Sequence, residues 1–273
     1  MPRDNYDWLA PYGFAFVGVI LLSAIVHLVL RWAQNKYDFL WYRQVMSFRK
    51  LSLSRKQTLE TFSFYKNLDS TYQKQFEHRV ACFITDKVFR RRSGAQVTDV
   101  QKVTISCVAV MLTFGRRNYM MDQLETILIF EEPFTSAANS QKHKGEYNPR
   151  AAVLALSWPD VLKGIKDAKD NFHLALHEFT HVIHIESERA QHIDAMRYHK
   201  YHQLILIRLM QKDLRRTMER SPFFREYAFT NQYEFMAVLT EYFFESYEEL
   251  KAQFPQLHEL MSKALLFEEK WMS

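Results

Sequence analysis

Residues 11–30 form an uncharged, largely apolar run of twenty residues, PYGFAFVGVILLSAIVHLVL. A helix rises about 1.5 Å per residue, so this run spans roughly 30 Å, the thickness of the hydrocarbon core of a bilayer. Trp8 and Tyr12 flank one end and Trp32 the other, where aromatic side chains favour the membrane surface. The run therefore predicts one transmembrane helix within an N-terminal anchor, residues 1–32.

Two other interpretations of this run are weaker. A cleaved signal peptide carries a basic start and small residues at its cleavage site, whereas this chain begins with Arg3, Asp4 and Asp7 and bulky residues follow the run. A helix buried in a soluble domain is possible, but this stretch lacks the polar face expected there. A single-pass anchor is the favoured interpretation.

Basic residues follow the apolar run, with Asp38 as the only acid among them: Arg31, Lys36, Arg43, Arg49, Lys50, Arg55 and Lys56. The positive-inside rule places the remainder of the chain in the cytoplasm. Residues 33–53 are predicted to be a basic juxtamembrane linker that lies against anionic lipid, or a solvated helix face, and both can hold. The net charge of +5 is modest, and its location favours lipid over direct binding of nucleic acid.

Residues 54–273 are expected to form one soluble domain. Helix is predicted for some forty residues from position 54, with a break near 67–70 and a loop at Arg90–Gly94. Thr98 and Gln101 have the spacing of a capping box that opens a helix ending near Gly115, although β-branched residues there keep a strand as a competitor.

Two short segments have clear strand character, residues 126–130 and 152–156. Ser157 and Asp160 repeat the capping-box spacing, with Pro159 in the first turn. Helices dominate from Asp170 onward. The predicted fold class is therefore α+β, mostly helical, with a small β-sheet.

The sequence His177-Glu178-Phe-Thr-His181 lies in a predicted helix that Asp170 or Asn171 would cap. Residues i and i+4 share a helix face, so the two imidazoles can converge on one Zn²⁺ at about 2.0–2.1 Å. Glu178 follows the first histidine, where its carboxylate can act as a general base on water. This spacing predicts a catalytic zinc site.

A catalytic zinc needs a third protein ligand. Glu234 and Glu241 lie seven residues apart on one face of a segment that is predicted to be helical from Tyr227. A carboxylate on an apolar face is costly unless it is paired or bound to metal. The spacing alone does not choose between the two glutamates.

Other histidines crowd this region. His173 and His184 continue the ligand face by one turn in each direction. We expect them to support the ligands or to pack nearby, with ligation of a second metal as the alternative.

These motifs resemble the zinc peptidases typified by Mlc titration factor A, and a shorter version of the pattern occurs in the anthrax lethal factor catalytic domain. The resemblance covers about residues 54–268. It rests on the segments HEFTH, LALSWPDV, NQYEFMAVLTEYFFE, FITDKVF, VTDVQKVTISCVAVMLTFG and FPQLHELM.

The resemblance implies a zincin-like domain that binds one Zn²⁺ through His177, His181 and Glu234, with Glu178 as the base. It implies that Tyr227 hydrogen-bonds the tetrahedral intermediate, a role that suits a phenol donor. Glu241 would then orient a histidine ligand from behind.

Three features depart from the family pattern. The usual HEFAHxxD core has Thr180 and His184 here, and a tyrosine common near FPxLY is His258. None of these changes removes an implied ligand. The predicted anchor is the largest departure, because family members described as cytosolic lack one.

Together these observations predict a membrane-anchored zinc metallopeptidase, single-pass in a bacterial inner membrane, with its catalytic domain facing the cytoplasm. Its expected partners are a peptide or protein substrate and membrane lipid; endopeptidase and aminopeptidase action both remain open. The alternative is a regulatory protein that titrates a transcriptional repressor at the membrane with little or no catalysis. A helical membrane protein with an accidental motif is the third interpretation.

Overall fold

The computed structural model describes residues 10–36, 49–135, 142–167, 169–221 and 223–272. The chain divides into two compact units, residues 1–47 and 48–273. Predicted features that fall on other residues, including Trp8 and the larger part of the basic linker 33–53, lie outside the described residues.

The described part of the first unit is α1 (Ala10–Lys36), which includes the whole apolar run. Large apolar side chains along it are more than half exposed, among them Phe14, Phe16 and Leu22. Within the part of the chain that the structure describes, no helix is both long enough and apolar enough to cross a membrane. The transmembrane part of the predicted fold is therefore not supported, although the predicted helix is present.

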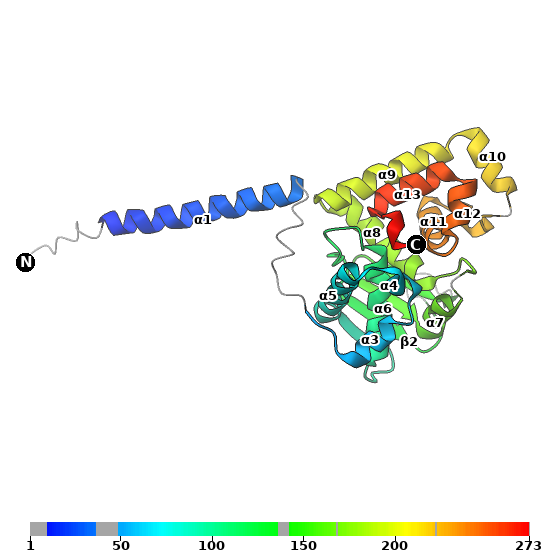
Figure 1. Cartoon of the computed structure of the whole chain (residues 1–273), viewed down its shortest axis with the longest axis horizontal. Helices are drawn as coiled ribbons and strands as arrows, with labels where there is room; N and C mark the ends of the chain where they lie inside the picture. The colour runs from blue at the N-terminus through cyan, green and yellow to red at the C-terminus, as the bar shows by residue number, and fades with distance from the viewer. Residues whose placement is uncertain (1–9, 37–48, 136–141, 168, 222, 273) are drawn as a thin grey trace, which may run out of the picture. The chain divides into compact units, whose positions relative to one another are not determined.

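The second unit is an α+β domain, mostly helical with a small sheet, as predicted (Figure 1). Its helices in the first half are α3 (Leu53–Leu59), α4 (Ser63–Asn67), α5 (Ser70–Asp86), α6 (Asp99–Leu112) and α7 (Trp158–Lys166). The helices that follow are α8 (Leu174–Arg189), α9 (Ile193–Leu209), α10 (Lys212–Arg220), η2 (Glu226–Phe229), α11 (Gln232–Glu245), α12 (Tyr247–Gln253), α13 (Pro255–Leu265) and η3 (Glu269–Trp271).

The main sheet has the strand order β1-β2-β6-β5. Its strands are β1 (Val88–Arg91), β2 (Thr126–Phe130), β6 (Val153–Ser157) and β5 (Gly145–Asn148). The first three are parallel, whereas β5 runs antiparallel to β6 and forms an edge, with Gly145 opposite Leu156. Between β2 and β5 in the sequence, β3 (Phe134–Thr135) and β4 (Lys142–His143) form a separate short antiparallel pair.

The two predicted strands are confirmed as β2 and β6, but the loop predicted at Arg90–Gly94 is wrong at its start. Arg90 and Arg91 belong to β1, which pairs with β2 from a distant part of the chain. Consecutive arginines carry no alternating pattern, so only the partner strand makes this segment extended. The strand β5 was also not predicted, because its sequence carries no alternating pattern and its extended form depends on pairing with β6.

The helix predicted after Thr98 is confirmed as α6, and the competing strand is wrong. Thr98 and Gln101 form the complete capping box, and almost every side chain of α6 is buried. The second box does not form, because the hydroxyl of Ser157 donates to the carboxylate of Asp160 at 2.6 Å and leaves the helix backbone uncapped.

Helix α8 lies at the centre of the second unit and packs against α6, α9, α11 and strand β5. Arg116, in the segment after α6, donates from Nη2 to Glu186 of α8 at 2.8 Å, and both side chains are fully buried. Breaking a buried ion pair by removing one partner leaves an uncompensated charge, which costs several kcal/mol. This contact therefore fixes α8 against the segment that follows α6.

Candidate metal centre

Helix α8 begins later than the sequence predicted. Asn171 adopts a left-handed conformation with φ of 57°, so the chain turns there instead of starting the helix. His173 is the N-cap, and its Nδ1 accepts a hydrogen bond from the backbone N–H of Leu176 at 3.3 Å. The predicted cap at Asp170 or Asn171 is wrong, because the first turn uses an imidazole rather than an Asx side chain.

The structure brings together the three predicted ligands. His177 and His181 lie one turn apart on α8, and Glu234 lies in the first turn of α11. One donor atom from each residue lies within 4.8 Å of the other two. His177 Nε2 is 3.0 Å from Glu234 Oε2, and His181 Nε2 is 3.7 Å from Glu234 Oε1.

The cap of α11 positions the carboxylate of this group. Asn231 precedes the helix, and its side-chain oxygen accepts from the backbone N–H groups of Tyr233 and Glu234 at 2.9 and 3.0 Å. Capping by Asn is among the strongest signals for a helix start. Glu234 therefore points from a fixed helix end toward α8, which α11 contacts along its length.

The donor chemistry fits zinc. Burial lowers the pKa of His181 to about 4, with the nearby His177 acting in the same direction, so its imidazole is neutral and offers a lone pair. His177 differs: although burial acts to lower its pKa, hydrogen bonds to Glu234 and Glu241 raise it to about 10. In the metal-free protein His177 is therefore protonated, and its positive charge is stabilised by the Glu234 carboxylate. A zinc ion bound to both residues would take the place of the proton on His177 Nε2.

Glu241 supports His177 from the opposite side. Its Oε1 is 2.7 Å from His177 Nδ1, and its Oε2 accepts from the backbone N–H of His173 at 2.7 Å. A carboxylate on the second ring nitrogen of a metal-binding histidine fixes the tautomer and the orientation of the ring. The structure thus places Glu241 where the resemblance implied and puts Glu234, rather than Glu241, among the three donors.

Arg225 is a residue of this site that sequence reasoning missed. Its Nη2 donates to Glu241 Oε1 at 2.5 Å, and its guanidinium lies over the ring of Phe172 at 4.4 Å from the centroid. It also donates to the backbone carbonyl of Asn171. It lies in an irregular segment before η2, so no periodic pattern could identify it.

Glu178 is buried beside the three donors. Burial raises its pKa to about 7; the charge of His177 opposes this shift and that of Glu234 adds to it. Such a pKa suits a group that accepts a proton near neutral pH.

Gly145, on the edge strand β5, is a second residue that sequence reasoning missed. A Cβ atom built there would lie 2.5 to 2.7 Å from side-chain atoms of Glu178. Only glycine allows the strand to approach the carboxylate so closely. In the sequence, the available signal for such a close approach was a lone glycine at the start of a short segment without a clear strand pattern, and this signal is weak.

Tyr227 lies in η2, before α11, so the segment predicted as one helix is two elements separated at residues 230–231. The Tyr227 ring centroid is 6.1 Å from that of His177, its side chain is half exposed, and its hydroxyl hydrogen-bonds Glu234. Partial burial, with the charge of Glu234, raises its pKa well above the ordinary value. The phenol is therefore a protonated donor at the rim of the site.

His184 lies one turn beyond His181 and is buried away from the donors. Its Nε2 is 3.2 Å from Glu188, and its ring packs edge-on against His202 and Tyr233. Among the described residues, one set of three side chains is placed to hold a metal ion together, and it consists of His177, His181 and Glu234. The alternative of a second metal at His173 or His184 therefore gains no support.

Two comparisons with known proteins bear on this geometry. The profile of the glucose-regulated metallopeptidase family M90 matches residues 40–265. A protein of Synechocystis sp., "Uncharacterized protein slr2042", is 25% identical over 226 residues, which cover 73% of this chain and 78% of that protein. The residues matched by the family profile include every member of the site described above.

Proposed function

Because the chain belongs to the glucose-regulated metallopeptidase family M90, we propose that it is a zinc-dependent peptidase that hydrolyses peptide bonds at the site of His177, Glu178, His181 and Glu234. The observation that carries the proposal is the convergence of three donors within 4.8 Å beside a buried glutamate. That arrangement matches a catalytic zinc site, which has three protein ligands and one open position.

Zinc held by His177, His181 and Glu234 would supply a Lewis acid that polarises the scissile carbonyl and makes water more acidic. Glu178 would accept the proton of the attacking water and later transfer it to the leaving amine. Tyr227 would donate its hydroxyl proton in a hydrogen bond to the developing oxyanion. Glu241, held by Arg225 and the backbone of His173, would keep His177 in one orientation.

The edge strand β5 offers a place for the substrate backbone. Among the described strands β5 pairs with β6 alone in the main sheet, and its first residue, Gly145, abuts Glu178. An extended peptide can add to such an edge through main-chain hydrogen bonds. We propose that the substrate binds as a short strand along β5, which places a peptide bond near Glu178.

The test is cleavage of a peptide library by the full chain and by Glu178→Gln. The variant keeps the size of the side chain and both histidines but lacks the base, so we expect its cleavage rate to fall by roughly 100-fold or more while its zinc remains. Full activity in the variant would refute the mechanism.

Attachment to a membrane through residues 11–30, with the catalytic domain in the cytoplasm, is a further part of the proposal. It is supported by the uncharged run in the sequence and by the exposed apolar side chains of α1. Contact of the basic linker with anionic lipid belongs to the same proposal. Titration of a transcriptional repressor stays a prediction of the sequence, because no feature of the described surface favours that partner.

A further inference from the structure

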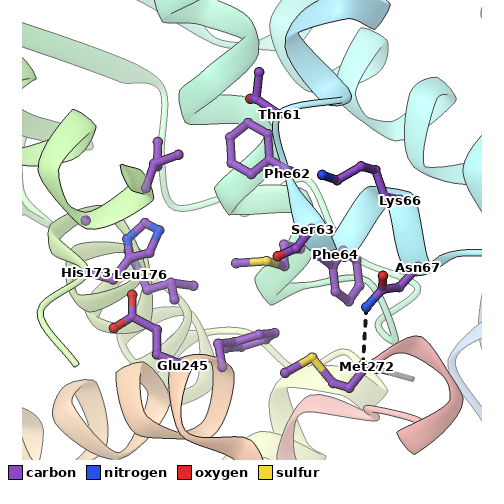
Figure 2. Close-up of a pocket in the computed structure, with 14 residues that line it drawn as sticks. Thr61, Phe62, Ser63, Phe64, Lys66, Asn67, His173, Leu176, Glu245 and Met272 are labelled. Carbon is purple, nitrogen blue, oxygen red and sulfur yellow. Dashed lines mark hydrogen bonds between the residues drawn. The ribbon is translucent and has the colours of Figure 1, made fainter. Parts of the chain in front are cut away.

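Two cavities of the second unit differ in their position relative to the edge strand β5. One, of about 370 Å³, lies between α4, α7, the start of α8 and the end of α11, and no residue of β5 lines it (Figure 2). The other, of about 390 Å³, lies on the main sheet and is bordered by Glu146 and Asn148 of β5. This second cavity, the sheet cavity, therefore adjoins the strand along which we propose that the substrate binds.

The register of β5 determines which of its side chains face the sheet cavity. Gly145 pairs with Leu156, and a Cβ atom at Gly145 would point at Glu178. Side chains alternate along a strand, so the next residue, Glu146, faces the other side of the sheet, as does its partner Ala155. Glu146 is partly buried and lines the sheet cavity.

Glu146 is the acid of the sheet cavity, and its charge is not neutralised by a neighbour. Lys144, two residues earlier, pairs with Asp160 at 2.7 Å. Arg92 also lines the cavity, but β1 and β5 are separated by three strand spacings, roughly 14 Å. Among the described residues, no cation forms an ion pair with Glu146. The remaining wall is largely apolar and consists of Leu128, Phe130, Phe134, Val153 and Ala155 with a few small or polar residues.

A peptide strand added to β5 would place one side chain directly beside Glu146. Opposed residues of neighbouring strands have Cβ atoms about 4.5–5.5 Å apart, and opposite charges at such positions attract. Substrate residues paired with Gly145 and Tyr147 would face the α8 side instead. The charge of Glu146 contributes to the raised pKa of Glu178, so its carboxylate lies within electrostatic range of the metal centre. The side chain beside Glu146 would therefore belong to a residue close to the cleaved bond.

We propose that Glu146 determines specificity by pairing with a lysine or arginine side chain of the substrate. The aliphatic stem of that side chain would pack on the apolar wall beside Ala155, while its charged group stays at the carboxylate. This inference rests on the proposed function, because it needs a peptide strand along β5. Glu146 takes no part in the hydrolysis itself.

The experiment compares kcat/KM for matched peptides, with the full-length, zinc-loaded protein in detergent. A positional library first identifies the position at which a basic residue accelerates cleavage. The matched peptides carry arginine or its neutral isostere citrulline at that position, and both peptide ends are blocked, so that no other cation is present. The wild type should cleave the arginine peptide roughly two- to fivefold faster, and rising salt should reduce this ratio.

Three variants test the role of Glu146. Glu146→Gln should cleave both peptides equally, at the rate at which the wild type cleaves the citrulline peptide. Glu146→Lys should reverse the preference and favour glutamate over glutamine at the same position. Glu249→Gln, which removes an exposed acid on α12, is the matched control and should keep the preference for arginine. The zinc content of all three should equal that of the wild type, because none of them changes a metal donor.

The outcomes separate this inference from the proposed function. Equal cleavage of the two peptides by the wild type, or a preference for arginine that survives in Glu146→Gln, overturns the inference and leaves peptide hydrolysis standing. A preference for the cation that appears only when the peptide has a free N-terminus also overturns it, because Glu146 would then bind the α-ammonium group. If the wild type cleaves no peptide, the proposed function fails, and fluorescence anisotropy with the labelled peptides tests Glu146 alone. Tighter binding of the arginine peptide that is lost in Glu146→Gln supports the pairing, and equal binding of the two peptides, or no binding, overturns it.

Discussion

Glu178 shows how burial adapts a single residue for catalysis. Its carboxylate is shielded by strand β5 on one side and lies near other acids, which together raise its pKa to about 7. Ionisation of this group in the metal-free protein therefore opposes folding. The neighbouring zinc would offset this cost in the loaded protein, so the cost is visible only after metal removal.

The first prediction is that Glu178→Gln stabilises the metal-free protein at alkaline pH. The folded pKa of about 7 exceeds the ordinary value of 4.5, so the wild type loses stability as pH rises from about 4.5 to 7 and stays lower above it. At pH 8 the free energy of unfolding of the variant should exceed that of the wild type by roughly 3–4 kcal/mol, because each unit of pKa difference is worth about 1.4 kcal/mol.

Urea denaturation of both proteins at several pH values measures this difference, with Glu249→Gln as control. The difference in stability should vanish below about pH 4.5, where Glu178 is neutral in both the folded and the unfolded state. Equal stability of Glu178→Gln and wild type at pH 8 would show that Glu178 is not buried as described.

At the scale of elements, the site depends on how α8, α11 and β5 meet. The sequence motif identified α8 and its two histidines, because i,i+4 spacing is a local property. Contacts between elements were less accessible: residue spacing left Glu234 and Glu241 equivalent, and only the family resemblance separated them. Arg225 and Gly145 had no adequate local signal, since each acts through a contact formed only in the folded domain.

The second prediction concerns the contact between α8 and α11. Glu241→Gln removes the charge that orients His177 and pairs with Arg225. We expect the affinity for zinc to fall by roughly 10–100-fold, as substitutions behind metal ligands do. Competition with a chelating dye measures this affinity, and an affinity equal to that of the wild type would contradict the assigned role of Glu241.

The third prediction concerns the approach of β5 to α8. In Gly145→Ala the added methyl group overlaps the Glu178 side chain, so the carboxylate must move and peptide cleavage should fall by about tenfold or more. The zinc content should be unchanged, because no ligand is displaced.

Gly18→Ala is the matched control for this change, because a Cβ at position 18 meets no atom within 4 Å. Cleavage rates of the two variants, measured with the same peptide, make the comparison. Unchanged cleavage by Gly145→Ala would mean that the strand and the glutamate are not in contact in the working enzyme.

At the scale of the whole molecule, the sequence predicted the α+β class, the small sheet and the order of most helices. Hydrophobic periodicity and capping residues determine these features locally, as at Thr98 of α6. The strands β1 and β5 were missed because their extended form depends on pairing with β2 and β6. The proposal that the N-terminal helix is a membrane anchor comes from the sequence. The structure gives its apolar side chains as exposed, and what surrounds those side chains in the cell determines the function of the helix.

The fourth prediction is that the full chain resists carbonate extraction from membranes and is released by detergent. Charges placed on the apolar helix should reverse this behaviour, because each costs a few kcal/mol in the bilayer core. The double change Leu21→Arg and Ile25→Arg should move the protein to the soluble fraction. Release of the unchanged chain by carbonate would refute the proposed anchor.

The most direct test of the central claim is the metal content of the purified full chain and of Glu234→Ala. Elemental analysis should find roughly one zinc per chain in the wild type, and the variant should lose most of it after dialysis against a weak chelator, because two histidines alone bind zinc weakly. Glu249→Gln should retain its zinc under the same treatment. A wild-type chain without zinc, or a Glu234→Ala variant that retains it as firmly as the wild type, would contradict the assignment of His177, His181 and Glu234 as the metal centre.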